Sequence, residues 1–151
     1  MGVLDKIDLA VLREVAVNGR ITVTDLAHRV GLSKTPCALR LRRLEESEHI
    51  LGYRAILHPE KMGASHIAFV QVILTDTKTE ALNAFNKAVR DVPEIEQCHM
   101  IAGAFDYLIK VRSRDIGDYR RVLGEKISEL PYVSHTSTFV VMEAVKDSYS
   151  L

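Results

Sequence analysis

The sequence has no tryptophan and only two cysteines, Cys37 and Cys98, among its 151 residues. The two cysteines are far apart, and neither has a metal ligand at short spacing. This pattern favours free thiols in a reducing compartment over a disulfide framework or a zinc site. The six histidines form no HxxxH motif and no Cys/His cluster. We therefore expect no metal ion and no cofactor.

Long apolar runs and an excess of charge are also missing. No apolar stretch approaches the roughly 18 residues that a membrane helix needs, and charge within the first six residues is unlike a secretion signal. We expect a cytoplasmic protein with no membrane partner. Twenty Lys and Arg offset twenty Asp and Glu, so net charge alone does not suggest nucleic acid. The contents of 47% hydrophobic and 26% charged residues are typical of one ordinary or two small globular domains.

The charges are nevertheless unevenly placed along the chain. Residues 26–44 contain no acidic side chain, whereas acidic residues occur directly before and after them. This block carries five basic residues: Arg29, Lys34, Arg40, Arg42 and Arg43. A local positive surface of this kind suits the phosphate backbone of duplex DNA. The alternative is an ordinary solvated helix pair with one basic face.

The same block has the pattern of two helices joined by a tight turn. Thr24 is a candidate N-cap of the first helix, Gly31 is placed to end it, and Ser33 is a candidate cap of the second. Pro36 falls in the opening turn of the second helix, where a missing N–H is tolerated. The side chains expected to pack inward are Leu39, Leu41 and Leu44.

Other helices and a linker complete the first part of the chain. Residues 5–17 are predicted to form a helix with Asp5 as its N-cap, so this part has three helices. Residues 50–57 favour a short strand or wing, and residues 58–63 favour a hinge because they contain both Pro59 and Gly63. We place the domains at 1–56 and 65–151, with a hinge linker at 57–64.

From residue 65 the hydrophobic pattern changes its period. It predicts a strand at 65–74, a helix at 77–89, strands at 95–101 and 107–111, a helix at 116–130 and a strand at 133–142. This order is that of a ferredoxin-like βαββαβ domain, so the fold class is α+β with an N-terminal three-helix, winged helix-turn-helix domain. Apolar residues occupy both faces of the first strand. We therefore expect the open face of the sheet to pack on another copy of the chain.

Short motifs recur in a specific order along nearly the whole chain. They are LDKID at 4–8, LA at 26–27, VGLS at 30–33, TPC at 35–37, RLRRLE at 40–45, ILGY at 50–53, GAFDY at 103–107 and TST at 136–138. Together they resemble the Lrp/AsnC (leucine-responsive/asparagine-responsive, feast–famine) transcription regulators. The resemblance implies a domain that binds double-stranded DNA by helix-turn-helix. It also implies a second domain that forms homodimers, assembles them into octamers or similar rings, and binds a free amino acid as effector between dimers.

Candidate DNA-binding residues lie on or near the second helix of the pair. Its N-terminal hydroxyl and ammonium groups could touch phosphates or base edges, although Ser33 could equally serve only as a cap. Arg40 and Arg43 are the main candidates for groove or backbone contacts, and Cys37 either lets the helix approach DNA or lies in the core. The full set is Arg29, Ser33, Lys34, Thr35, Pro36, Cys37, Arg40, Arg42, Arg43 and Arg54.

The segment GAFDY is the candidate effector site. Gly103 leaves room for a ligand near its backbone N–H, and Asp106 could pair with an α-ammonium group. The alternative is a hairpin turn in which Asp106 caps the backbone. With the resemblance, we expect a pocket formed by Met100, Ile101, Ala102, Gly103, Ala104, Phe105, Asp106, Tyr107, His135, Thr136, Ser137 and Thr138.

Three functions are compatible with these patterns. The leading hypothesis is a sequence-specific DNA-binding transcription regulator whose assembly or operator affinity responds to a small amino acid. An architectural protein that binds DNA without an effector is the first alternative. A small-molecule enzyme is the second, because ferredoxin-like domains also host chemistry. No nucleophile–base pair or metal-ligand set supports it in the sequence.

Overall fold

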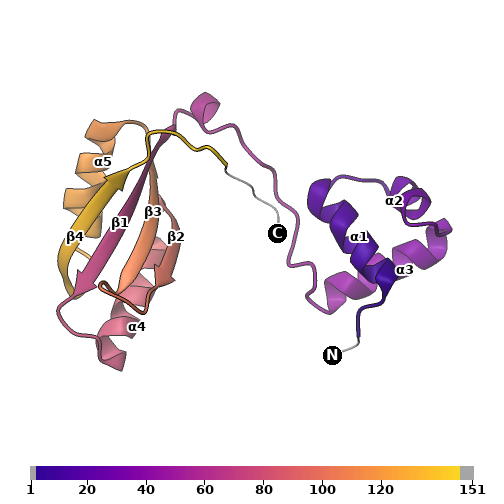
Figure 1. Cartoon of the computed structure of the whole chain (residues 1–151), viewed down its shortest axis with the longest axis horizontal. Helices are drawn as coiled ribbons and strands as arrows, with labels where there is room; N and C mark the ends of the chain where they lie inside the picture. Colours follow the sequence, from indigo (N-terminus) through magenta and orange to yellow (C-terminus); the bar gives the residue numbers. More distant parts are fainter. Residues whose placement is uncertain (1–2, 147–151) are drawn as a thin grey trace. The chain divides into compact units, whose positions relative to one another are not determined.

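The structure is a computed structural model that describes residues 3–146. The chain divides into two compact units, one ending at Ile56 and the other spanning Leu57–Val145 (Figure 1). Each unit has its own hydrophobic core. None of the helices within the described residues is long and apolar enough to cross a membrane.

The first unit contains three helices, α1 (Lys6–Val17), α2 (Val23–Arg29) and α3 (Lys34–Glu46). Asp5 caps α1 as predicted, and it forms a reciprocal capping box with Asp8. All three helices contribute to one core, in which Val11, Leu26, Ala27, Cys37 and Leu44 are almost fully buried. The α1–α2–α3 arrangement confirms the helix-turn-helix prediction.

Two details of the turn differ from the predictions. The N-cap of α2 is Thr22 rather than Thr24, because the Thr22 hydroxyl accepts a hydrogen bond from the backbone N–H of Asp25. Ser33 occupies the N-cap position of α3, but its side chain makes no capping hydrogen bond. Gly31 ends the α2 turn at φ 71°, a conformation that glycine adopts without strain.

The strand or wing predicted at residues 50–57 is absent from the described structure. Residues 51–58 have no regular secondary structure, and all strand pairing among the described residues lies within the sheet of the second unit. A strand needs a second strand to pair with, and none lies beside this segment among the described residues of its unit. A single 3₁₀ turn, η1 (Glu60–Met62), follows and ends at Gly63.

The second unit has the βαββαβ order that the sequence predicted. Its elements are β1 (His66–Leu74), α4 (Thr79–Ala88), β2 (Ile95–Met100), β3 (Tyr107–Ser113), α5 (Ile116–Val122) and β4 (Val133–Val140), with a short turn η2 (Val89–Asp91) after α4. The four strands form one antiparallel sheet in the order β2-β3-β1-β4. The ferredoxin-like fold is therefore confirmed.

The predicted helix at 116–130 is α-helical only as far as Val122. The wider π-type turn η3 (Leu123–Ile127) continues it. The change of winding still leaves Ile127 and Leu130 buried in the core. The inward face was thus predicted correctly, although the uniform helix was not.

One face of the sheet carries the core. Alternate residues of β1, from Ala68 to Leu74, pack with residues of α4 and α5, so both helices cover the same face (Figure 1). The rings of Phe85 in α4 and Tyr107 in β3 lie 4.3 Å apart between their centroids. This contact joins α4 to the middle of the sheet.

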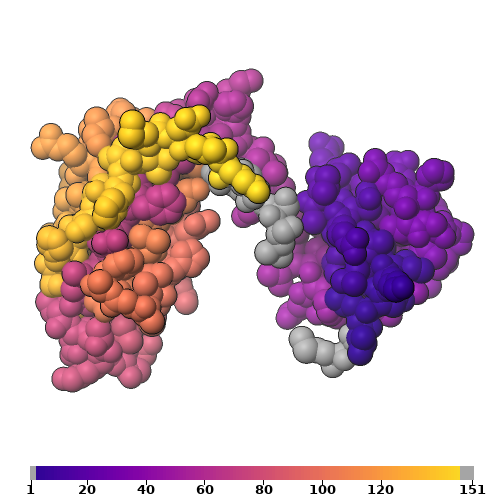
Figure 2. All heavy atoms as spheres, viewed as in Figure 1, coloured from indigo at the N-terminus to yellow at the C-terminus, as the bar shows by residue number. Residues whose placement is uncertain are grey.

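The opposite face of the sheet is partly apolar. Phe69 of β1 lies directly across from Phe139 of β4, and both Ile73 and Phe139 are exposed. Figure 2 shows side chains of β1 (magenta) between those of β4 (yellow) and of β2 and β3 (orange). Lys110 is almost buried on this face and pairs with Glu96 at 3.5 Å. We call this surface the open sheet face.

The burial of Ile127 gives a direct test of the second core. Ile127→Ala should lower the free energy of unfolding by about 2 to 5 kcal/mol, because it leaves a cavity in a closely packed region. The matched change Ile116→Ala removes the same atoms from an exposed position in the same unit and should cost less than about 1 kcal/mol. Denaturant unfolding measures both, and equal losses would contradict this core assignment.

Candidate DNA-binding and effector sites

Helix α3 has a buried face and an outer face. Cys37 and Leu44 lie in the core of the first unit. At about 100° per residue, Leu39 points about 200° away from Cys37, directly opposite the core. Leu39 is 63% exposed, so the prediction that it packs inward was wrong. Thr35 and Arg42 share its side of the helix at the spacing of one turn.

Cys37 is fully buried against the other helices of its unit. Burial raises the pKa of its thiol. A side chain in this position cannot reach DNA from a docked helix, so its inclusion among the DNA-binding candidates was wrong. The alternative that Cys37 belongs to the core is confirmed.

The carboxylate of Asp8 lies at the centre of an ion cluster between α1 and α3. It is 1% exposed, and it accepts hydrogen bonds from Arg40 at 2.8 Å and from Arg43 at 2.5 Å. Arg40 also donates to Asp5 at 2.5 Å. Two charged side chains of α3 are therefore joined to the start of α1.

This cluster changes the roles open to the two arginines. The Arg40 side chain is only 27% exposed, and its Nη1 already bonds both aspartates. Arg40 is therefore less available for the groove or backbone contact that the sequence suggested. Arg43 remains 59% exposed beside Asp8, so part of its guanidinium still faces solvent. The sequence motifs contained Asp5, Asp8, Arg40 and Arg43, but no periodicity within one helix pairs residues on two helices.

The charge of Asp8 is maintained by its partners. Burial alone would raise the pKa of this carboxyl, but the backbone N–H of Asp5, the Arg40 guanidinium and the Arg43 charge together hold the pKa below its ordinary value. The backbone N–H of Asp8 and the bond from Arg40 likewise lower the pKa of Asp5. The folded first unit thus favours both carboxyl groups in their ionised form.

The remaining basic candidates are more open. Arg42 is 74% exposed and pairs with Glu46, one turn further along α3. Arg29 pairs with Glu14 and is more than half exposed. Ser33, Lys34, Thr35 and Pro36 are all exposed at the start of α3. The N-terminal half of α3 therefore presents hydroxyl, ammonium and guanidinium groups to solvent.

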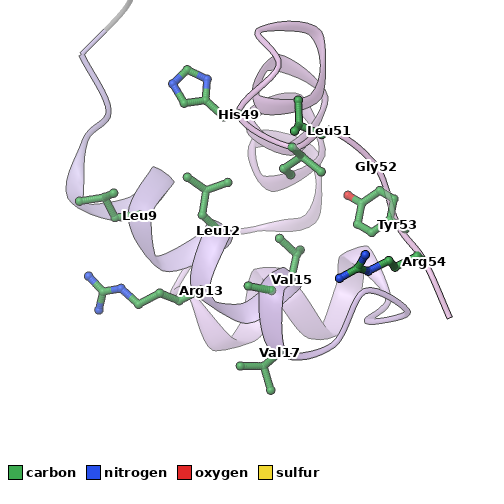
Figure 3. Close-up of a pocket in the computed structure, with 12 residues that line it drawn as sticks. Leu9, Leu12, Arg13, Val15, Val17, His49, Leu51, Gly52, Tyr53 and Arg54 are labelled. Carbon is green, nitrogen blue, oxygen red and sulfur yellow. The ribbon is translucent and has the colours of Figure 1, made fainter. Parts of the chain in front are cut away.

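An apolar groove lies between α1 and the segment that follows α3 (Figure 3). Leu9, Leu12 and Val17 line it from α1, and residues 49–54 line the other side. The Tyr53 hydroxyl donates to Glu45 at 2.8 Å, and burial, with this bond, raises the pKa of Tyr53 to about 12. Figure 3 shows Arg54 beside Tyr53 on the segment that leaves the unit. Arg54 is therefore placed by this segment rather than by α3.

In the second unit, the candidate effector segment is the loop between β2 and β3. The Asp106 carboxylate accepts a hydrogen bond from the backbone N–H of Leu74 at 2.7 Å, and the N–H of Asp106 donates to the carbonyl of Val72. Ala102, Gly103 and Ala104 are exposed between these anchors. Asp106 thus caps a neighbouring strand, close to the alternative of a backbone-capping Asp106 that the sequence suggested.

Two predicted effector residues are directed into the core side of the sheet. Tyr107 is 1% exposed, stacks on Phe85 and donates its hydroxyl to Asn86. Thr138 shares a hydrogen bond of 2.5 Å with the Tyr119 hydroxyl of α5. The placement of Tyr107 as a ligand contact was wrong, because the ring fills the core between the sheet and α4.

The other candidates meet at one end of the sheet. Val72 pairs with Tyr107 on one side and with Thr136 on the other, so the loop and the start of β4 flank the same part of β1. His135 and Ser137 lie on the open sheet face, where their side chains are 3.4 Å apart. Met100, Ile101 and Phe105 complete the loop side. No group of His, Cys, Asp and Glu within residues 3–146 could hold a metal ion.

The Asp8 cluster predicts a pH-dependent stability. The folded state lowers the pKa of Asp8, so its contribution is complete above the ordinary aspartate value of about 4 and is lost as pH falls through the lower folded value. Asp8→Asn should cost about 1 to 3 kcal/mol at pH 7, and the gap from wild type should narrow below about pH 4. Calorimetric unfolding at several pH values measures it. Glu46→Gln, which alters an exposed pair, is the control and should change little. A gap that is constant from pH 7 to pH 3 would contradict the ionic role.

Comparisons with known proteins agree with this geometry. Residues 4–50 match the family model of a winged helix-turn-helix DNA-binding domain, and residues 67–151 match that of the Lrp/AsnC ligand binding domain. A proline dehydrogenase transcriptional activator of Rhizobium radiobacter is 60% identical over 96% of this chain and 93% of its own. The leucine-responsive regulatory protein of Escherichia coli is 46% identical over 98% of this chain and 90% of its own.

Solved structures show the same fold. A transcriptional regulator from Neisseria meningitidis, in complex with L-Met, has a TM-score of 0.93 at 31% identity and covers 99% of this chain and 96% of its own. An AsnC family transcriptional regulator from Agrobacterium tumefaciens also has a TM-score of 0.93, at 30% identity, and covers 98% of this chain and 96% of its own. The chain belongs to the Lrp/AsnC family of transcriptional regulators.

Proposed function

We propose that this regulator binds a specific operator in double-stranded DNA and that a small free amino acid changes its assembly or its operator affinity. The observation that carries the proposal is the outer face of α3, where Thr35, Leu39 and Arg42 face solvent opposite a closed core. A helix presented in this way by a helix-turn-helix fits the major groove. Residues 1–56 would bind DNA, residues 57–64 would act as hinge, and residues 65–151 would bind effector and join subunits. The site of action is then the cytoplasm, with the chromosome.

We assign different roles to the individual basic residues of this block. Lys34 and Arg42 are open and are assigned to phosphate contacts, with Arg29 and Arg54 as outer anchors. Arg40 is assigned to holding α3 against α1, because both of its partners lie within the unit. Arg43 does both, since it bonds Asp8 and remains more than half exposed.

The role of Arg42 can be measured through the salt dependence of binding. Arg42→Ala should weaken binding to all duplexes to a similar extent, because a phosphate contact carries no sequence information. The slope of log affinity against log salt should fall by about one for each Arg42 that contacts a phosphate. Fluorescence anisotropy with a labelled duplex gives this slope. Arg90→Ala, an exposed arginine of the second unit, is the control. An unchanged slope in Arg42→Ala would remove this residue from the interface.

The open sheet face supports a homodimer. Phe69 and Phe139 form an apolar pair on the face opposite α4 and α5, and Ile73 continues this apolar strip beyond Gln71 and Ser137. Charged residues border it, because Glu96 pairs with both Lys110 and Arg112. A second copy could cover the strip, since an isologous contact buries the same surface on both subunits. Further assembly of dimers to an octamer or similar ring belongs to the same proposal.

The names of two relatives suggest which gene and effector to test. Proline dehydrogenase transcriptional activators of Rhizobium radiobacter and Rhodobacter capsulatus are 60% and 54% identical to this chain. We assign this chain to the control of a proline-degrading enzyme, with proline as the effector. Proline offers a carboxylate for backbone N–H groups of the exposed 102–104 loop, a cationic nitrogen for Asp106, and an apolar ring for Phe105.

Two substitutions at Asp106 separate its structural role from a ligand contact. Asp106→Asn keeps an oxygen that can accept the Leu74 N–H but removes the charge, whereas Asp106→Ala removes both. Titration calorimetry should show saturable proline binding to the wild type, loss of binding in both variants, and a lower unfolding temperature mainly in Asp106→Ala. Leucine and methionine in the same titration test the other effectors. If the wild type gives no saturable heat with proline or with any other amino acid, an effector-independent DNA-binding protein is favoured.

A further inference from the structure

The outer face of α3 carries one prominent apolar side chain. Leu39 is 63% exposed, while the other leucines of α3, Leu41 and Leu44, pack in or against the core. Thr35 precedes it by one turn and Arg42 follows it by one turn, so a polar group and a cation flank it on the same face. Packing within the first unit does not account for a leucine at this position.

The ion pairs with Asp5 and Asp8 limit which side chains of α3 are available to contact the base edges of DNA. A bidentate arginine–guanine contact needs a free guanidinium fork, but Arg40 is bonded to Asp5 and Asp8, and Arg43 is bonded to Asp8. The centre of the outer face therefore presents the Leu39 isobutyl group, with the exposed side chains of Arg42 and Arg43 beside it. Among the base edges of the major groove, thymine alone presents a methyl group that such a side chain can contact.

We propose that Leu39 is a specificity-determining residue that contacts the 5-methyl group of a thymine in each half-site of the operator. The proposal rests on the proposed DNA-binding function and goes further, because it names the residue and the chemical group that it reads. Burying one methyl group against a leucine changes affinity by about fourfold. The contact adds discrimination between thymine and uracil, which differ only in this methyl group.

The test replaces thymine by deoxyuridine in a duplex that the protein itself selects. The full-length wild-type chain first enriches binding sequences from duplexes with a randomised central stretch. Each thymine of the enriched site is then replaced in turn by deoxyuridine, which keeps the base pair and removes the methyl group. Affinities are measured for the wild type, Leu39→Ala and Leu39→Met. Leu51→Ala removes an even more exposed leucine of the same unit outside α3 and serves as the control.

The expected result is a loss of about fourfold per half-site at one thymine position for the wild type and for Leu51→Ala. Leu39→Ala should bind thymine and uracil duplexes equally, and Leu39→Met should keep part of the difference because its side chain still reaches the groove. Equal wild-type affinity for every substituted duplex, or the same uracil penalty in Leu39→Ala, would overturn the proposal while leaving DNA binding intact. Failure of the wild type to enrich any sequence would overturn the proposed function and this inference with it.

Discussion

The buried Asp8 carboxylate is the constraint on which the first unit depends. A charge that is 1% exposed is costly unless it is paired and hydrogen-bonded, and two arginines of α3 satisfy it. The pairing sets the rotation of α3 about its own axis, because Arg40 must face α1 while Cys37 and Leu44 face the core. The side of α3 that remains for DNA is therefore determined in part by the ion cluster between α1 and α3.

Pairing with Asp8 reduces the positive charge that α3 presents to DNA. A guanidinium that neutralises Asp8 contributes less field to an approaching phosphate, so the five basic residues of the 26–44 block overstate the charge presented to DNA. Lys34, Arg42 and Arg29 carry most of the open charge, with part of Arg43. The basic residues therefore fall into two sets with different roles, which the composition alone does not distinguish. Arginines near α1 hold the helix in place, and the outer residues are the ones proposed to contact DNA.

The sequence predicted the fold class, the helix-turn-helix and the order of the strands because those depend on local periods of hydrophobicity. It did not predict which arginines are free, because the Asp8–Arg40 and Asp8–Arg43 pairs join residues more than thirty positions apart. Leu39 could have been placed correctly by helical phase, since it lies opposite Cys37 and Leu44. The segment 50–57 had strand-like composition but lacks a partner strand within its unit, which composition does not reveal.

At the candidate effector site, some of the candidate residues likewise support the fold instead of facing a ligand. Tyr107 and Thr138 were read as contacts, yet both bond to residues of the helical layer, Asn86 and Tyr119 respectively. Asp106 ties the loop to β1 where the β1–β4 register shifts between Ile73 and Leu74. A ligand that binds this carboxylate would therefore lie where β1, β3 and β4 meet rather than on an isolated loop. Because Ile73 lies on the open sheet face next to Leu74, a change at Asp106 is one hydrogen bond and one peptide bond away from the surface proposed to join subunits.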